Sequence, residues 1–181
     1  MTSNGGAQKH EESGTIFVVH ASGGGQTLYS FGQLGSDNDG INPWGGLISN
    51  GSLLYGTTYS GGTDHCGTVY SFDPASNTES AVHDFTCGSD GGYPFPTLIA
   101  QSGILYGVTS FGAEGNCGGS GCGAAYSFDP SSGTVTSLYE FSGKSDGGNP
   151  EAELFSAGGM LYGTTFDGGK KNLGTVFALT P

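Results

Sequence analysis

Apolar and aromatic residues in this chain fall into short runs of four to six, separated by turns rich in Gly, Asn, Asp and Pro. Four kinds of run, A to D, recur in one order. Run A is GGLI at 45–48, TLIA at 97–100 and AELF at 152–155; run B is LLYGTT at 53–58, ILYGVT at 104–109 and MLYGTT at 160–165. Run C is GTVYSF at 67–72, GAAYSF at 123–128 and GTVFAL at 174–179; run D is TLYSF at 27–31, AVHDF at 81–85 and SLYEF at 137–141. Such short runs predict β-strands, because helices need about ten residues or more.

The repeat is a little over fifty residues long, since Gly67, Gly123 and Gly174 open successive copies of run C at spacings of 56 and 51. Four antiparallel strands per repeat are typical of a β-propeller blade, and neighbouring blades stack face to face. The segments GTIFVV at 14–19 and TLYSF at 27–31 supply runs C and D of a further, partial blade. We therefore predict an all-β, β-propeller-type fold of about three four-stranded blades plus flanking strands.

The blades also define the predicted domain organisation. Residues 1–13 are expected to be a flexible N-terminal segment, and residues 14–181 a single β-repeat domain. Its blade repeats lie at 14–31 (partial), 41–85, 92–141 and 148–181 (partial). A closed propeller needs about four blades or more. The ring is therefore expected to be completed by a longer parent array or by oligomerisation, with unpaired blade edges joining copies into a homo-oligomer.

Composition excludes several classes of protein. Glycine accounts for 37 of 181 residues, but aromatic residues reach 12% and charged residues only 11%, which argues against disorder. The net charge is −12, with four lysines and no arginine. The basic surface that nucleic acids or anionic membranes require is therefore lacking. No apolar run approaches the ~20 residues that span a bilayer, so we expect no membrane insertion.

The repeated phrases resemble a known family. The segments SDGGNP, LYGTTFDGG and LGTVFAL are similar to the GloVer tandem repeat of bacterial extracellular proteins, which is named for a variable choice of surface anchor. The resemblance covers residues 14–181 and weakens at Val108 and at Ala124–Ala125. It implies a secreted or surface-displayed array of propeller type, and no established activity. The N-terminal residues lack the apolar core of a signal peptide, so we expect any signal or anchor to lie outside this chain.

Four cysteines in a chain expected outside the cell predict disulfides. Cys66 directly precedes run C and Cys87 directly follows run D of the same repeat. Since runs C and D are antiparallel neighbours, these two cysteines should meet and form a bridge. Cys122 takes the place of Cys66 in the next repeat, where Gly143 takes the place of Cys87, so Cys122 is expected to pair with Cys117. A zinc site is the alternative, although paired C-x-x-C hooks are lacking.

The B–C and D–A loops are expected on one face of the propeller, and long variable loops on a rigid scaffold commonly bind ligands. Asp37, Asp90 and Asp146 recur in the acidic phrase of the D–A loops, and Asp37 with Asp39 forms a DxDG spacing. An Asx-turn is the favoured interpretation of these aspartates. A calcium site at Asp37 and Asp39 is the alternative, because calcium prefers carboxylate and carbonyl oxygens.

Two aromatic residues, Trp44 and Tyr93, follow the acidic loops. If exposed, their rings can stack on a sugar ring; if buried, they pack between blades, which is the favoured interpretation. Together with the four aspartates they form the set of candidate ligand-binding residues.

Catalysis finds little support in the sequence. Glu151 and Glu153 alternate along run A and would share one face, as an acid–base pair requires, but the other repeats lack them. The four histidines fit no triad or metal pattern: His10, His20, His65 and His83. We predict no catalytic residue and no cofactor other than calcium. The favoured function is binding of a glycan or a surface protein, or structural assembly, through the B–C and D–A loop face. The alternatives are a glycan-active enzyme working in the channel of an assembled propeller, and a purely structural self-assembling scaffold.

Overall fold

The computed structural model describes residues 13–33, 37–95, 97–113, 115 and 117–181. The flexible segment predicted at 1–13 lies, apart from Ser13, outside these residues. In chain order the strands are β1 (Thr15–Val19), β2 (Gly25–Ser30), β3 (Ile48–Asn50), β4 (Leu53–Thr58), β5 (Thr68–Asp73), β6 (Thr78–Asp84), β7 (Gly92–Pro94), β8 (Ile99–Gln101), β9 (Ile104–Phe111), β10 (Ala124–Asp129), β11 (Thr134–Glu140), β12 (Phe155–Ala157), β13 (Met160–Thr165) and β14 (Thr175–Leu179). A short 3₁₀ helix, η1, spans Asp37–Asp39. In the described part of the chain, no helix has the length and apolar character needed to cross a membrane.

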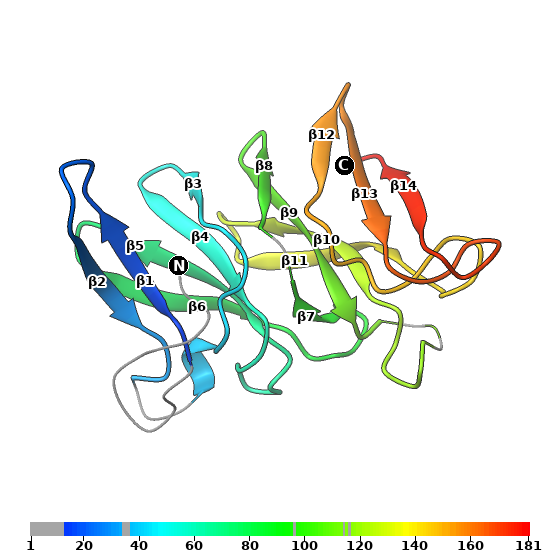
Figure 1. Ribbon diagram of the computed structural model, residues 1–181, viewed down its shortest axis with the longest axis horizontal. Helices are drawn as coiled ribbons and strands as arrows, with labels where there is room; N and C mark the ends of the chain where they lie inside the picture. The colour runs from blue at the N-terminus through cyan, green and yellow to red at the C-terminus, as the bar shows by residue number, and fades with distance from the viewer. Residues whose placement is uncertain (1–12, 34–36, 96, 114, 116) are drawn as a thin grey trace.

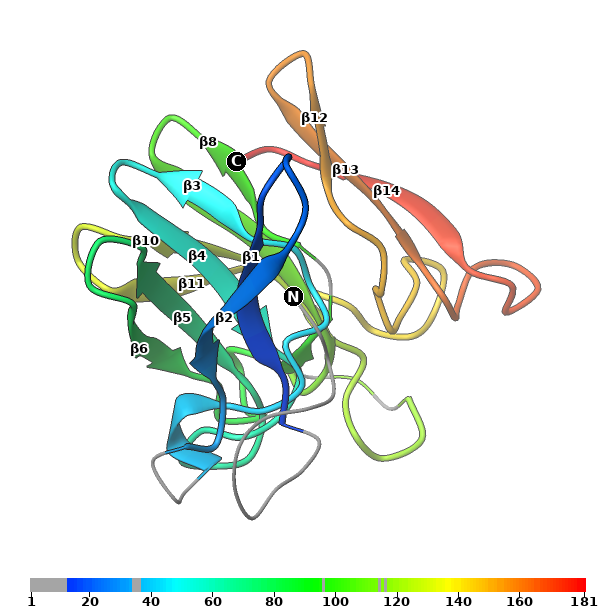
Figure 2. The ribbon, with the colours of Figure 1, turned by 60° about the vertical axis from the view of Figure 1, so that its left-hand side comes forward.

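The strands form four antiparallel sheets that follow one another in chain order (Figures 1 and 2). Strands β1 and β2 form the N-terminal hairpin, and β3-β4-β5-β6 form the first blade. The second blade is β8-β9-β10-β11, with β7 added on β9, and the C-terminal blade is β12-β13-β14. Runs A to D of the sequence thus become strands one to four of the first and second blades, while the C-terminal blade has strands one to three and the N-terminal hairpin has strands three and four. The predicted all-β architecture of repeated four-stranded units is confirmed.

The bounds predicted for run A are wrong. Strands β3, β8 and β12 begin at Ile48, Ile99 and Phe155, two or three residues after the predicted starts. The chain before them pairs separately: Gly92 and Pro94 of β7 pair with Phe111 and Thr109 of β9, and single bridges join Ile41 to Ser60 and Gly148 to Asp167. The first strand of each blade is therefore split. Each split contains a proline, Pro43, Pro94 or Pro150, which has no N–H to donate and is tolerated only at a sheet edge.

The hydrophobic core lies between neighbouring sheets. Ile16, Tyr29 and Phe31 of the N-terminal hairpin pack on Tyr70 and Phe72 of the first blade. The next cluster joins the first and second blades through Tyr55, Cys66, Val69, Phe85, Leu98, Leu105, Tyr126 and Phe128. The last joins the second and C-terminal blades through Tyr106, Val108, Cys122, Ala125, Phe141, Leu154 and Leu161. Each blade needs a neighbour on both sides to bury its two faces, as repeat proteins do.

The repeated Tyr-Gly-x-Thr phrase of strand two is explained by contacts within the blade. A Cβ at Gly56 would lie 2.5 Å from the hydroxyl oxygen of Tyr70, so only glycine lets the third-strand ring cross there. Two residues on, Oγ1 of Thr58 accepts a hydrogen bond from the backbone N–H of Thr68 at 3.1 Å. The same bond recurs from Ala124 to Thr109 and from Thr175 to Thr165, at 3.1 and 3.0 Å. The phrase therefore specifies the fold of the blade.

Candidate functional site

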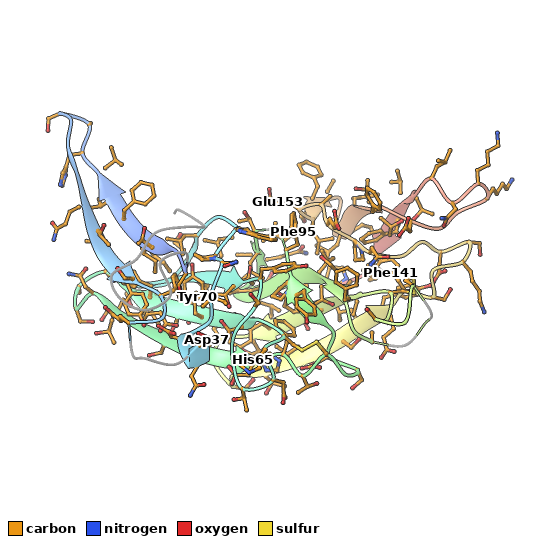
Figure 3. The ribbon with its side chains drawn as sticks, turned by 60° about the horizontal axis from the view of Figure 1, so that its bottom comes forward. Asp37, His65, Tyr70, Phe95, Phe141 and Glu153 are labelled. Atoms are coloured by element: carbon orange, nitrogen blue, oxygen red, sulfur yellow. A yellow bond between two sulfur atoms is a disulfide. The ribbon has the colours of Figure 1, made fainter. Side chains whose placement is uncertain are left out.

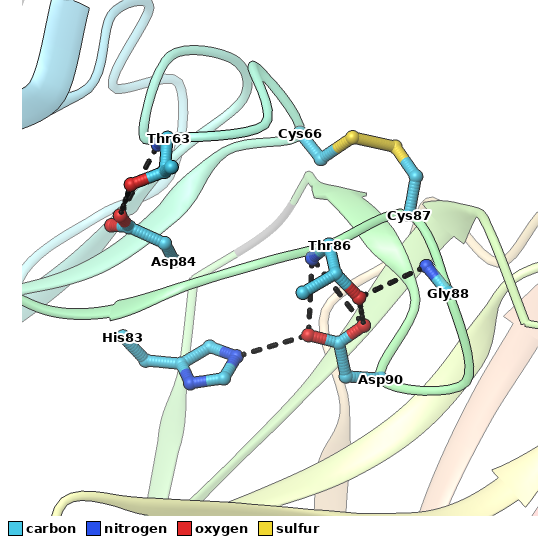
Figure 4. Close-up of polar contacts among 8 residues, drawn as sticks. All are labelled: Thr63, Cys66, His83, Asp84, Thr86, Cys87, Gly88 and Asp90. Carbon is cyan, nitrogen blue, oxygen red and sulfur yellow. Dashed lines mark hydrogen bonds and ion pairs between the residues drawn. A yellow bond between two sulfur atoms is a disulfide. The ribbon is translucent and has the colours of Figure 1, made fainter.

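The aspartate of the second acidic loop is turned inward, toward the strand that precedes it. Oδ2 of Asp90 accepts a hydrogen bond from the backbone N–H of Thr86 at 3.1 Å, and the Thr86 hydroxyl donates to Oδ1 (Figure 4). Nε2 of His83 lies 3.2 Å from Oδ2. Because Thr86 lies two residues after the last residue of β6, Asp90 joins the loop to the end of that strand.

The other two acidic loops contain the same arrangement, which we call the aspartate latch. Oδ2 of Asp39 accepts from the N–H of Gly32 at 2.9 Å and from the hydroxyl of Tyr29 at 2.7 Å. Oδ2 of Asp146 accepts from the N–H of Ser142 at 2.9 Å and from the hydroxyl of Tyr139 at 3.0 Å. The predicted equivalence of Asp37 with Asp90 and Asp146 is therefore wrong: Asp39 takes that position. Local hydrogen bonds to backbone N–H groups, as in an Asx-turn, account for the three latch carboxylates.

Asp37 begins η1, and its carbonyl oxygen accepts hydrogen bonds from the N–H groups of Gly40 and Gly62, at 2.9 and 2.7 Å. Within the described ranges no three His, Cys, Asp or Glu side chains lie close enough to hold a metal ion. Asp37 and Asp39 are therefore not joined by a third such ligand, and Asp39 is oriented toward Tyr29 and Gly32. A calcium site at this loop stays a prediction.

The latches differ in their electrostatics. Burial raises the pKa of Asp39 above its usual range, although the hydrogen bonds from Tyr29 and Gly32 oppose this. Glu79 of β6 faces the same pair, and burial raises its pKa to about 8. At Asp146 burial also acts to raise the pKa, but the hydrogen bonds from Ser142 and Tyr139 together lower it. The pKa of the latch carboxylate is thus shifted up in the first latch and down in the third.

Both expected disulfides are present. Cys66 is bridged to Cys87 with the Cα atoms 5.6 Å apart, and Cys117 is bridged to Cys122 with the Cα atoms 5.1 Å apart. Gly143 occupies the position equivalent to Cys87. A Cβ there would collide with the sulfur of Cys117, so glycine leaves the space that the Cys117–Cys122 bridge fills. Disulfide sulfurs are not available as thiolate ligands, which leaves no cysteine for the zinc alternative.

Five aromatic side chains gather where the D–A and B–C loops meet the first strands of two blades. We call Trp44, Tyr59, Tyr93, Phe95 and Phe111 the aromatic cluster. The Trp44 ring stacks on Tyr59 at a centroid distance of 4.3 Å and meets Phe95 edge-on at 5.3 Å. Tyr59 contacts Tyr93 at 5.2 Å, and Tyr93 contacts Phe111 at 5.8 Å. Trp44 and Tyr93, the two aromatic candidates from the sequence, therefore belong to one connected group that spans two blades.

The aromatic cluster is open to solvent at one end and has polar neighbours. Trp44 keeps 45% of its surface exposed although it packs against two rings. Burial raises the pKa of Tyr59, and the charges of Tyr93 and Glu151 add to this effect, which places the Glu151 carboxylate within electrostatic range of the cluster. On its other side, Tyr93 lines a cavity of about 450 Å³ together with Cys87, Ala113 and Ser120.

The backbone of Tyr93 has a conformation that its side chain does not favour. Its φ is +57°, and the equivalent residues Asn42 and Asn149 have φ of +61° and +53°. Asparagine tolerates this left-handed region, whereas a bulky aromatic residue there is strained. The N–H of Tyr93 donates to the carbonyl of Cys66 at 2.7 Å, which holds the strained backbone in place beside the disulfide.

The carboxylate pair proposed for acid–base chemistry is not arranged as expected. Glu151 and Glu153 are both exposed, and both precede β12, which begins at Phe155. They therefore do not alternate along a strand, and the argument that they share one face of run A is wrong. Figure 3 places Glu153 and Phe95 on the upper side of the view, with Asp37 and His65 toward the lower side.

Sequence reasoning missed Tyr59, Phe95 and Phe111. Their contacts join residues from different loops and strands, and the contact of Trp44 with Phe95 joins two repeats, so no local pattern indicated them. One signal was present: the residue after the proline of each D–A loop is Trp44, Phe95 or Glu151, which is unusual variation within an otherwise regular repeat.

Comparison with known proteins agrees with the resemblance noted in the sequence. The family described as the Gloeobacter/Verrucomicrobia repeat matches residues 1–177. A chain of the nidogen/laminin complex aligns with a TM-score of 0.56 and 16% identity, over 92% of this chain and 56% of that one. TolB from Acinetobacter baumannii aligns with a TM-score of 0.52 and 13% identity, over 91% of this chain and 34% of that one. These neighbours are β-propeller-type proteins, which confirms the predicted fold class, and this chain spans about half and about a third of their lengths. The search of curated proteins found no match.

Proposed function

Because this chain belongs to the Gloeobacter/Verrucomicrobia repeat family and its repeats fold as propeller-type blades, we propose that it is a glycan-binding module whose ligand stacks on the aromatic cluster. The observation that carries the proposal is the connected group of five rings ending in a half-exposed Trp44. The scaffold is rigid at this point, since two blades and one disulfide hold the surrounding loops.

The chemistry of the cluster suits a sugar. One face of a pyranose ring presents C–H groups and packs well on an aromatic ring, while its hydroxyls need polar partners at the edge. Binding sites typically combine such an apolar surface with a few placed polar groups. Here Trp44 offers the open ring, and the Glu151 carboxylate is the charged group near Tyr59.

The strain at Tyr93 gives a second reason. Two repeats place asparagine at this left-handed position and one places tyrosine. Strained residues of this kind are concentrated at functional sites, because a structural role would favour the relaxed residue. We assign Tyr93 to ligand contact from the cavity side and to support of Tyr59 from within the cluster.

We also propose that the module acts outside the cell or at its surface. Two disulfides support this location, since such bridges persist in oxidising compartments. Carbohydrate polymers of cell walls and extracellular matrices are the ligands available there.

Trp44 is the only tryptophan of the chain, so its fluorescence reports directly on the proposed site. Glycan-array screening identifies a ligand class, and titration of the best ligand should then shift or quench the Trp44 emission. Tyr93→Asn should weaken binding by about five- to thirtyfold, the effect of losing one stacked ring of about 1–2 kcal/mol. It should leave the fold intact or slightly more stable, since asparagine suits the backbone.

Phe166→Asn is the matched control, because it removes a ring that is 69% exposed and lies outside the aromatic cluster. Equal loss of binding in both variants would count against the aromatic cluster as the site. Absence of any glycan that binds the unmodified chain would overturn the proposal. Release of shortened sugars from a bound glycan would show instead that the alternative, a glycan-active enzyme, is correct.

A further inference from the structure

The C-terminal blade has a face whose large apolar side chains are exposed in the described part of the chain. Phe155, Tyr162 and Val176 lie on it with 69%, 40% and 79% of their surfaces exposed. They come from the three strands of the blade, one from each, and we call them the C-terminal face. Large exposed apolar patches on soluble proteins usually mark interaction surfaces.

The same positions are covered in both complete blades. Ile48, Tyr55 and Val69 are their equivalents in the first blade, and they belong to the core shared with the second blade. In the second blade the equivalents are Ile99, Tyr106 and Ala125, and the C-terminal blade covers them. The residues that cover the first blade are Tyr126 and Phe128 of strand three and Leu105 of strand two, together with Leu98, which directly precedes β8. The C-terminal face therefore has the shape of a surface that receives another blade.

The opposite end of the molecule exposes the complementary residues. Phe17 and Val19 of β1 are 37% and 66% exposed, and we call them the N-terminal face. They stand two residues apart on strand three, at the positions that Tyr126 and Phe128 use to cover the first blade. The N-terminal hairpin thus exposes side chains at the positions that, in the complete blades, cover the equivalent of the C-terminal face.

The free edge of the C-terminal blade adds a second feature. In the complete blades β6 pairs with β5 and β11 with β10, but β14 pairs only with β13 among the described strands. A groove of about 240 Å³ lies beside this edge, lined by Tyr139, Phe141, Asp146, Val176 and Phe177, among others. Backbone groups of an unpaired edge strand are available to a strand from another chain.

We propose that a second copy of this chain docks its N-terminal face on the C-terminal face, so that copies associate head to tail. No residue of the aromatic cluster takes part, and the inference stands independently of glycan binding. A head-to-tail interface uses two different surfaces, so it produces a closed ring if the rotation closes and an open filament if it does not.

The test uses charged variants of the two faces. Sedimentation velocity of the unmodified chain should show a mass that rises with concentration. Val176→Glu and Val19→Glu should each weaken self-association by at least about tenfold, because burying an unpaired carboxylate in an apolar contact is strongly unfavourable. Both sites are exposed, so both variants should fold, and circular dichroism checks this.

Mixing the two variants gives the decisive result. Each variant keeps one intact face, so an equimolar mixture should form a complex of one copy of each and grow no further. Thr136→Glu, on the exposed side of β11, adds the same charge away from both faces and should associate like the unmodified chain. A monomer at every concentration would overturn the proposal. So would unchanged association of Val19→Glu, which would indicate contact between two C-terminal faces.

Discussion

The second blade and the C-terminal blade contain nearly the same strands but differ in what covers them. Tyr106 and Tyr162 occupy the same position of strand two, with 7% and 40% of their surfaces exposed. Both blades pair strands two and three antiparallel in the same register, with Gly107 opposite Tyr126 and Gly163 opposite Phe177. The repeat sequence therefore specifies the strands, while the neighbouring blade determines how much a given side chain stabilises the fold.

The largest expected effect separates these two tyrosines. Tyr106→Ala should lower the free energy of unfolding by about 3 kcal/mol or more, because it opens a cavity in the core between the second and C-terminal blades. Tyr162→Ala should lower it by less, about 1 kcal/mol, because 40% of the surface of that residue is already exposed to solvent. Urea denaturation of both variants, at a concentration where the chain is monomeric, measures the difference.

Equal losses at a higher concentration, where copies associate, would show that the C-terminal face is covered in solution. Repeating the experiment with Val19→Glu in the background would then tell whether a second copy covers it. The difference in unfolding free energy between Tyr106→Ala and Tyr162→Ala would thus measure how far the proposed head-to-tail contact covers the C-terminal face.

The next largest effect on stability concerns the disulfide bridges, which the first and second blades contain and the C-terminal blade lacks. Cys66–Cys87 closes a loop with a sequence separation of 21 and joins the start of strand three to the end of strand four in the first blade. Replacing both cysteines by alanine should destabilise the chain by about 3 kcal/mol. Removing Cys117–Cys122, with a separation of 5, should have a smaller effect, about 2 kcal/mol.

Thermal unfolding of the two double variants measures this order. A larger loss from the short bridge would mean that Cys117–Cys122 acts by filling the space over Gly143 more than by closing a loop. Mass determination after alkylation without reductant provides the control, since four alkylated thiols would mean that neither bridge forms.

The sequence was sufficient to predict strands two, three and four, because their repeated phrases follow from contacts within one blade, such as Gly56 with Tyr70 and Thr58 with Thr68. It failed for strand one, where Pro43, Pro94 and Pro150 interrupt the pairing. The sequence alignment of the acidic loops also placed Asp37 at the latch position, although Asp39 forms the latch. The sequence alone does not show which of the two aspartates accepts the hydrogen bond from Gly32. The aromatic cluster required contacts between repeats, such as Trp44 with Phe95, which periodicity alone does not provide.

The smallest expected effect compares the first and third aspartate latches. Glu79 of β6 covers Tyr29 and Asp39, whereas no described fourth strand covers Tyr139 and Asp146. Burial raises the pKa of Glu79 from 4.5 to about 8, so the folded chain holds a proton there that the unfolded chain releases near pH 4.5. This contribution to stability is fully present below pH 4.5 and is lost as the pH rises through about 8.

Glu79→Gln removes this titratable carboxyl group. The free energy of unfolding should therefore decrease less between pH 4.5 and pH 8 than in the unmodified chain. At pH 8.5 the variant should be more stable than the unmodified chain by about 1 kcal/mol, because it no longer buries a carboxylate. Urea denaturation at a series of pH values measures the slope. Glu140→Gln on β11 is the control, since it removes a carboxylate from a fourth strand outside the first latch. If both variants change the slope equally, net charge and not the covering of Asp39 by β6 explains the pH dependence, and the two latches are electrostatically alike.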